Sequence, residues 1–149
     1  MKKSYYFVLF ASIAWCILIF ITPLFAYFHS NLAIFSKYFF SIICHQMPER
    51  SFFILGEQLP VCARCVGIYT GWLFGVLLYA FRGAVTTKKM LAISAIPIAL
   101  DALTQLTGLR ESTNLLRLLT GLLFGIILAL FLTHHLVELT SKFSKKYLK

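Results

Sequence analysis

Four apolar segments constrain this chain more than any other feature of its sequence. The first covers residues 5–28 and is interrupted only by Ser12, Thr22 and Pro23. A helix needs about 20 apolar residues to cross a bilayer, so this segment is long enough to span one. Two lysines precede it, as in a signal peptide, but it is too long for such a peptide and no cleavage motif of small residues follows. We therefore expect an uncleaved membrane anchor.

Three further segments predict membrane-spanning helices, at residues 66–81, 90–106 and 115–136. Hydrophobic residues make up 60% of the chain and the mean hydropathy is +0.84. Soluble domains have an apolar share of roughly 45–50%. A chain of 149 residues has room for one domain, here 1–149. The sequence thus predicts an all-α membrane protein with four transmembrane helices.

A fifth helix is expected between the first two spans. Residues 32–44 are apolar but too short to cross a bilayer. Polar residues recur in and just after this segment at helical spacing, at Lys37, Ser41, Cys44 and His45. A proline soon afterwards would end the helix. We expect a short helix in the outer membrane interface, with Cys44 and His45 at its C-terminal end.

The basic residues predict which side of the membrane each loop faces. Nine fall on one side and five on the other, and positively charged loops remain in the cytoplasm. Both termini are therefore expected in the cytoplasm of a multi-pass plasma-membrane protein. The net charge of +9 favours contact with anionic lipid rather than nucleic acid, because the basic residues form short runs beside apolar spans. The cytoplasmic set is Lys2, Lys3, Arg82, Lys88, Lys89, Lys142, Lys145, Lys146 and Lys149, and the extracytoplasmic set is Lys37, Arg50, Arg64, Arg110 and Arg117.

Three of the four cysteines and one histidine lie close together on the predicted extracytoplasmic face. Cys62 and Cys65 have the C-x-x-C spacing that chelates a metal, at a helix start whose N–H groups favour thiolates. Cys44 and His45 would complete a Cys3His set, for which zinc is the simplest metal. If only one of these two binds, a coordination position stays open for water or substrate.

The same cysteines are also compatible with a redox function. A C-x-x-C pair in an oxidising compartment tends to form a disulfide, and Arg64 between the thiols would make a thiolate more reactive. A four-helix bundle with such a pair is similar to the quinone-coupled disulfide oxidases and to vitamin K epoxide reductase, which use a second cysteine pair. Here only Cys44 remains outside the bilayer, since Cys16 is expected deep in the first span as a packing residue. A third alternative is a non-catalytic metal-handling or carrier protein.

Arginines gather on the same face as the cysteines. Arginine holds phosphate or carboxylate in a planar fork, so a lipid-linked anion is a suitable ligand. Asp101 is expected about 9–10 Å below the outer rim, where a buried acid indicates function. Arg117 falls in the first turn of a helix, where the dipole disfavours a cation, so it needs an anion nearby. A structural pair of Asp101 with Arg117 is the alternative.

These considerations assign roles to seven polar residues of the predicted pocket. If the protein is an enzyme, a metal-bound water would react with the substrate while Asp101 orients or deprotonates it. The residues expected to act in catalysis are Asp101, Arg110 and Arg117, and those expected to bind substrate are Arg50, Arg64, Gln105 and Asn114.

Glycines recur every fourth residue in the second and fourth spans. Gly67, Gly71 and Gly75 share one helix face, as do Gly121 and Gly125. Small residues at this spacing let two helix backbones approach closely in lipid. The segments around them, 70–75 and 120–125, share five of six residues, which predicts either an internal repeat or convergence between apolar helices.

Three motifs resemble a known family. They are Cys44-His45-Gln46 with Pro48-Glu49-Arg50-Ser51-Phe52, the run from Pro60 to Gly71, and the run from Asp101 to Gly121 that includes Gln105, Gly108, Arg110, Ser112-Thr113-Asn114 and Arg117. Together they look like a family of small prokaryotic membrane proteins catalogued as a domain of unknown function, over about residues 44–125. The resemblance implies a polytopic membrane protein with these residues as its signature, and it implies no activity.

Overall fold

The computed structural model describes residues 2–83, 86–108 and 111–147, with side chains for 3–81, 83, 86–108 and 111–139. Within these ranges, the helices long and apolar enough to cross a membrane cover Lys3–Tyr27, Ala63–Phe81, Lys88–Leu106 and Asn114–Leu139. The predicted four spans are therefore confirmed, with a short additional helix between the first two. The elements are α1 (Lys2–Tyr27), α2 (Asn31–Ser41), η1 (Pro48–Arg50), β1 (Ser51–Ile54), β2 (Glu57–Cys62), α3 (Ala63–Arg82), α4 (Lys88–Leu106) and α5 (Asn114–Tyr147).

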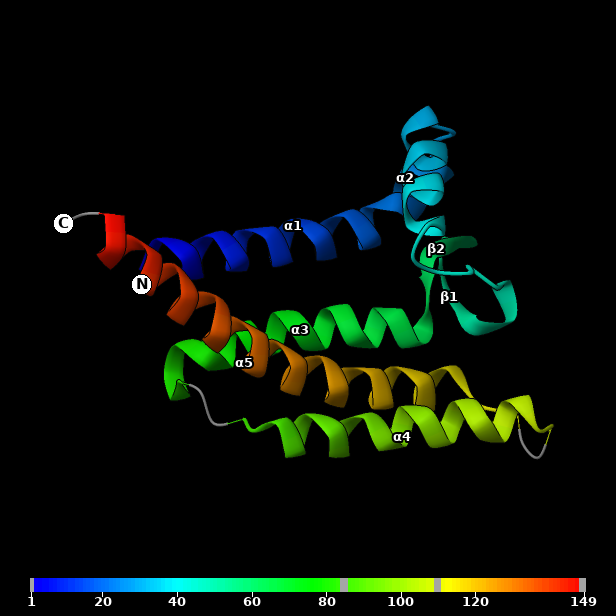
Figure 1. Ribbon diagram of the computed structural model, residues 1–149. Coiled ribbons are helices and arrows are strands. Elements are labelled where there is room, and N and C mark those ends of the chain that lie inside the picture. The colour runs from blue at the N-terminus through cyan, green and yellow to red at the C-terminus, as the bar shows by residue number, and fades with distance from the viewer. Residues whose placement is uncertain (1, 84–85, 109–110, 148–149) are drawn as a thin grey trace.

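Helices α3 and α5 form the centre of the bundle. They pack against each other more extensively than any other two described elements, while α1 packs on α3 and α4 packs on α5. Figure 1 shows α2 and the two strands gathered at one end of the bundle, opposite the start of α1 and the end of α5. The cytoplasmic placement of the termini remains a prediction.

The glycine faces of α3 and α5 pack directly on one another. A Cβ added at Gly71 would meet the backbone of Leu122 within about 3 Å, and one at Gly125 would meet the backbone of Ile68 equally closely. The two helices also run in the same direction, as Figure 1 shows. The predicted close approach is confirmed, and it brings the first turns of α3 and α5 to the same level of the bundle.

A β-hairpin connects η1 to α3, which the all-α prediction did not include. Strands β1 and β2 are antiparallel, and Ser51 lies opposite Cys62. Leu55 and Gly56 form the turn with φ of 54° and 79°. A two-residue hairpin loop of type I′ requires positive φ at both of these positions. Since β2 ends at the N-cap of α3, the hairpin determines where Cys62 enters the bundle.

The segment after α2 also differs from the prediction. The helix ends at Ser41, so Cys44 and His45 lie in the connection that follows rather than on its C-terminal turn. Gln46 reverses the chain there, with φ of 51°. Its amide donates hydrogen bonds of 2.7 Å to the carbonyl oxygens of Lys37 and Pro60. The irregular backbone is thus tied to both α2 and β2, which holds Cys44 beside the start of α3.

Candidate functional site

Three cysteine sulfurs come together at the end of the bundle that carries the hairpin. The Sγ atoms of Cys44, Cys62 and Cys65 all lie within 4.8 Å of one another. Cys44 comes from the connection after α2, Cys62 caps α3, and Cys65 is in its first turn. The backbone N–H of Cys62 donates to Cys44 Sγ at 3.2 Å. All four cysteines of the chain are free, and Cys16 lies apart, with its thiol donating to the carbonyl oxygen of Tyr69 at 3.6 Å.

The three thiols lie close enough together to hold a metal ion. A tetrahedral Zn²⁺ with Zn–S bonds of about 2.3 Å separates its sulfurs by about 3.8 Å, which is shorter than the 4.8 Å limit within which these sulfurs lie. Hydrogen bonds from the thiols of Cys44 and then Cys65 hold the pKa of Cys62 far below its usual range. Cys62 is therefore the sulfur best prepared to act as a thiolate.

His45 does not belong to this cluster. Its side chain is exposed, and the ligand atoms that converge are those of the three cysteines. It does line the cavity next to them. Of the predicted Cys3His set, the three sulfurs therefore lie together, whereas the imidazole of His45 lies at the cavity wall.

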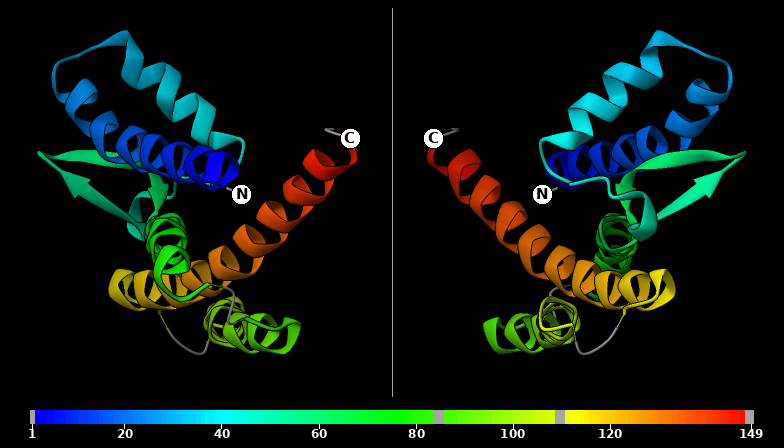
Figure 2. Two further views of the ribbon diagram at one scale, coloured as in Figure 1. Left: turned by 90° about the vertical axis from the view of Figure 1, so that its left-hand side faces the viewer. Right: turned by 90° about the vertical axis from the view of Figure 1, so that its right-hand side faces the viewer.

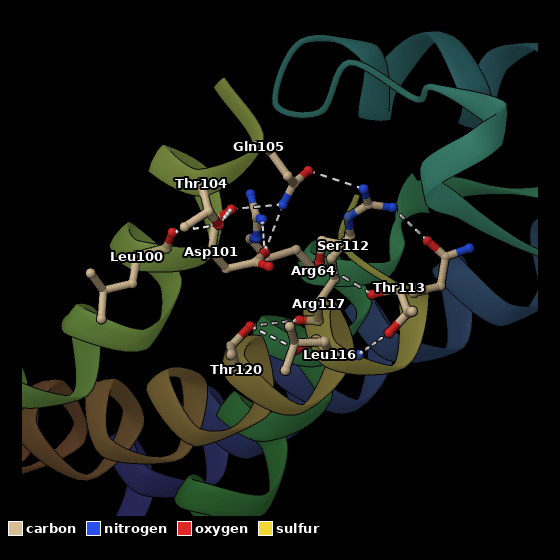
Figure 3. Close-up of polar contacts among 11 residues, drawn as sticks. Arg64, Leu100, Asp101, Thr104, Gln105, Ser112, Thr113, Leu116, Arg117 and Thr120 are labelled. Carbon is tan, nitrogen blue, oxygen red and sulfur yellow. Dashed lines mark hydrogen bonds and ion pairs between the residues drawn. The ribbon is translucent and has the colours of Figure 1, made fainter. Parts of the chain in front are cut away.

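A chain of polar contacts runs from α3 through α4 to α5. Arg64 Nη2 donates to Asp101 Oδ2, and Gln105 Nε2 donates to the same carboxylate oxygen at 3.0 Å. The other end of the Gln105 amide accepts a hydrogen bond from Arg117 Nη2 at 3.0 Å. Figure 3 shows Gln105 lying between Asp101 and Arg117. Arg117 Nη1 completes the chain with a bond of 2.8 Å to Asn114 Oδ1.

This arrangement changes the pairing expected from the sequence. The acid of α4 has Arg64 of α3 as an ion-pair partner, and it is joined to Arg117 through the amide of Gln105. Arg117 is only 7% exposed, and the acceptors of its two terminal nitrogens are neutral amides. The Nε atoms of Arg64 and Arg117 are buried without a hydrogen-bond partner in the described part of the chain. Two buried donors therefore remain for a ligand.

The remaining predicted pocket residues have different surroundings. Arg50 is exposed, with a long contact of 4.0 Å from its Nε to Glu49 Oε1. Asn114 Nδ2 donates to the backbone oxygen of Ser51 at 3.1 Å, which connects the start of α5 to β1. Arg110 lies outside the described residues, so its predicted role remains a prediction.

One cavity of about 330 Å³ joins the thiols to the arginines. The Asp101 side chain is 2% exposed and does not line this cavity. Its hydrogen-bond partners Arg64 and Gln105 do. The lining residues include the three cysteines with His45, Gln46, Arg50, Arg64, Gln105 and Arg117.

The sequence interpretation missed the residues that support this cavity. Gln58 Nε2 donates to the backbone oxygen of Gln46 at 2.7 Å and to Ser51 Oγ at 3.0 Å. Ser51 Oγ in turn donates to the carbonyl oxygen of Met47 at 2.8 Å. A signal was present, because Gln46 and Ser51 both fall in the first motif. Gln58 lies outside the three motifs, and the sequence carries no signal for it.

Comparison with known proteins places the chain in a family. Residues 44–131 match the family described as "Predicted membrane protein (DUF2085)". The chain is similar to an uncharacterized protein, MJ1492, of Methanocaldococcus jannaschii, with 42% identity over 153 residues that cover 95% of this chain and 98% of that protein. An uncharacterized protein of Methanothermobacter thermautotrophicus is 47% identical over 94 residues, which is 60% of this chain and 84% of that protein. No solved structure matches. The resemblance seen in the motifs is confirmed, and the chain belongs to the family described as "Predicted membrane protein (DUF2085)".

Proposed function

We propose that Cys44, Cys62 and Cys65 hold one metal ion, with zinc as the simplest candidate. The support is the convergence of three sulfurs from separate segments to within 4.8 Å of one another. Three sulfurs fill three positions of a tetrahedral ion and leave the fourth for an oxygen atom, which is the arrangement of catalytic rather than closed structural zinc sites. His45 would occupy that fourth position only after turning inward from its exposed conformation.

The ligand of this centre is an anionic group carried by a membrane lipid. The observation that carries this part is the shared cavity, whose wall contains the three thiols and Arg50, Arg64 and Arg117. Arg64 and Arg117 also belong to the first turns of the spans α3 and α5, so the cavity opens where a lipid head group would lie. A phosphate oxygen on the buried Nε donors would satisfy groups that otherwise have no acceptor in the described residues.

Each polar residue then has a role in holding the anion. Arg64 and Arg117 bind it, Gln105 positions Arg117, and Asp101 positions Arg64 through their ion pair. Arg50, at the exposed side, would attract the anion to the cavity. A bound zinc ion would polarise an ester bond of the ligand or lower the pKa of a water in its open position.

Metal content is the first test. Detergent-purified protein is expected to contain about one zinc per chain by elemental analysis. Cys62→Ser should lose most of this metal, whereas Cys16→Ser should keep it, because Cys16 is a buried cysteine outside the cluster. Equal metal loss in both variants, or metal-free wild-type protein, would overturn the metal centre.

Anion binding is the second test. Zinc-loaded protein is expected to bind inorganic phosphate, and Arg50→Gln should weaken this binding by about two- to fivefold, because it removes an exposed charge from the cavity wall. Lys88→Gln removes another exposed charge, from the first residue of α4 at the other end of the bundle, and serves as the control. Phosphate binding that is absent, or equally affected by both changes, would contradict the arginine pocket.

The same cluster favours one alternative, a thiol–disulfide oxidoreductase. Cys62 and Cys65 could form a disulfide and pass two electrons and two protons to a quinone, which would become a quinol. The close approach of Cys44 to both sulfurs would then serve disulfide exchange. Metal-free protein in which a Cys62–Cys65 disulfide forms with added quinone and is removed by a dithiol would support this alternative. Bound metal without turnover of any lipid would support a metal-handling protein.

A further inference from the structure

A second cavity, of about 390 Å³, lies within the membrane-spanning part of the bundle. It is formed by α1, α3 and α5, and Figure 2 shows α1 and α5 diverging on either side of α3. Its lining is apolar apart from the hydroxyls of Ser12 and Tyr69 and the indole N–H groups of its two tryptophans. The lining residues are Phe7, Val8, Ala11, Ser12, Trp15, Ile68, Tyr69, Trp72, Leu128 and Leu136, which we call the aromatic groove.

The aromatic groove begins one helical turn deeper than the arginine pocket. Tyr69 of the groove lies four residues after Cys65, and Ile68 lies four residues after Arg64, so each pair shares a face of α3. Trp15 joins the two regions from the side of α1, with its ring 5.6 Å from that of Tyr69 and 5.3 Å from that of Phe40. Phe40 packs in the same core cluster as Cys44. The two cavities therefore follow one another along α3.

The chemistry of the groove suits a hydrocarbon chain. Of its two hydroxyls, that of Ser12 is already used, since Ser12 Oγ donates to the Val8 carbonyl oxygen at 2.7 Å and accepts from Trp72 Nε1 at 2.9 Å. The buried Nε1 of Trp15 has no hydrogen-bond partner among the described residues. The groove residues of α1, from Phe7 to Trp15, extend over about 12 Å of helix. A long, apolar groove inside a bilayer offers little to a polar head group and accommodates an extended chain.

Resting on the proposed function, we infer that the aromatic groove binds the hydrocarbon chain of the anionic lipid whose head group occupies the arginine pocket. The arginines supply charge complementarity for the head, and the groove lies one helical turn further along α3, where the chain of a lipid held by that head would extend. Because the surrounding lipid is as apolar as the groove, burial of the chain in the groove contributes little hydrophobic affinity. The groove instead orients the chain and selects among lipids by the shape of their chains. One lipid molecule would thus occupy both cavities, with its head group bound by the arginines and its chain oriented by the aromatic groove.

The protein carries its own reporter for this inference. Both tryptophans of the chain, Trp15 and Trp72, line the groove. Bromine atoms on a lipid chain would therefore quench the intrinsic fluorescence when that chain enters. The experiment uses zinc-loaded protein in bilayer discs of unbrominated zwitterionic lipid, titrated with dodecyl phosphate brominated at the chain end. The matched probe has the same brominated chain with a phosphocholine head.

Saturable quenching is expected for the phosphate-headed probe, at a mole fraction about tenfold lower than the phosphocholine probe needs. Excess inorganic phosphate should reverse it. Ala11→Phe should reduce the saturable quenching, because Ala11 lines the groove and is exposed, so the added ring fills the cavity without displacing a packed neighbour. Ala14→Phe is the control, since Ala14 is equally exposed on α1 and lies outside the groove.

The outcomes separate this inference from the function on which it rests. If inorganic phosphate binds but both probes quench alike and in proportion to their mole fraction, the groove holds only surrounding lipid and the inference is wrong. If Ala11→Phe and Ala14→Phe behave identically, the chain lies elsewhere and the inference is also wrong. If wild-type protein binds no phosphate at all, the arginine pocket itself is refuted.

Discussion

Arg64 donates a charge-assisted hydrogen bond to Asp101, although the two residues lie 37 positions apart on different membrane-spanning helices. The Asp101 side chain is 2% exposed and the Arg64 side chain 25%. The pair therefore sits in a low-dielectric region, where each charge depends on the other. It links α3 to α4 and holds Arg64 at the wall of the cavity.

Asp101→Asn should destabilise the protein by about 3–5 kcal/mol, because it leaves a largely buried guanidinium without its counter-charge. The double variant Arg64→Met with Asp101→Leu should lose less, since it removes both charges of this pair. Thermal unfolding in detergent measures both. Lys37→Met is the control, because its pair with Glu57 is more than a third exposed and contributes about 0–1 kcal/mol. Equal losses in the single and double variants would contradict a buried pair.

Gly71→Val should separate α3 from α5 and destabilise the bundle by about 1–3 kcal/mol or more. Its first added carbon would already overlap the backbone of Leu122, which cannot move aside as a side chain can. Ala80→Val introduces the same side chain at an exposed position of α3 and should cost little. Comparing the unfolding temperatures of the two variants is the measurement. A similar small effect in both would show that the helices are not in close contact.

Cys62 of the metal-free protein should react with iodoacetamide at nearly the same rate at pH 6 and pH 8. Its pKa is lowered by hydrogen bonds from the Cys44 and Cys65 thiols, so it is already a thiolate at pH 6. An ordinary thiol is only about 0.3% ionised at pH 6, and its rate rises steeply up to pH 8. Mass spectrometry of the Cys62 peptide gives both rates. The denatured protein is the control, and a parallel rise in folded and denatured protein would refute the lowered pKa.

The hairpin end of the bundle should face outward from the cell. Glu111→Cys places a thiol in the exposed connection before α5, and Lys88→Cys places one at the exposed start of α4, at the other end of the bundle. A membrane-impermeant maleimide applied to intact cells should label the first variant and not the second, above the background of the parent protein. The opposite result would reverse the orientation derived from the basic residues.

Local patterns were enough to predict the spans and the helix faces that permit close packing. Apolar length alone identified four helices, because a bilayer requires about 20 apolar residues and nothing else in the chain competes with that signal. The spacing of glycines every fourth residue also indicated that α3 and α5 each have a face suited to close helix packing, since the face of a helix follows from its period. Only the structure shows that these two faces pack on each other.

Tertiary structure decided which polar groups meet. The hairpin was not predictable from strands of four and six residues, because its pairing is stabilised by the amide contacts of Gln46 and Gln58 with distant backbone. The partner of Asp101 depends on how α3, α4 and α5 are rotated about their axes, which residue spacing within one helix does not specify. The sequence by itself therefore determined the membrane class and the set of reactive residues. Only packing decided that the three sulfurs face one cavity with Arg64 and Arg117, because the contacts that bring them together link separate segments.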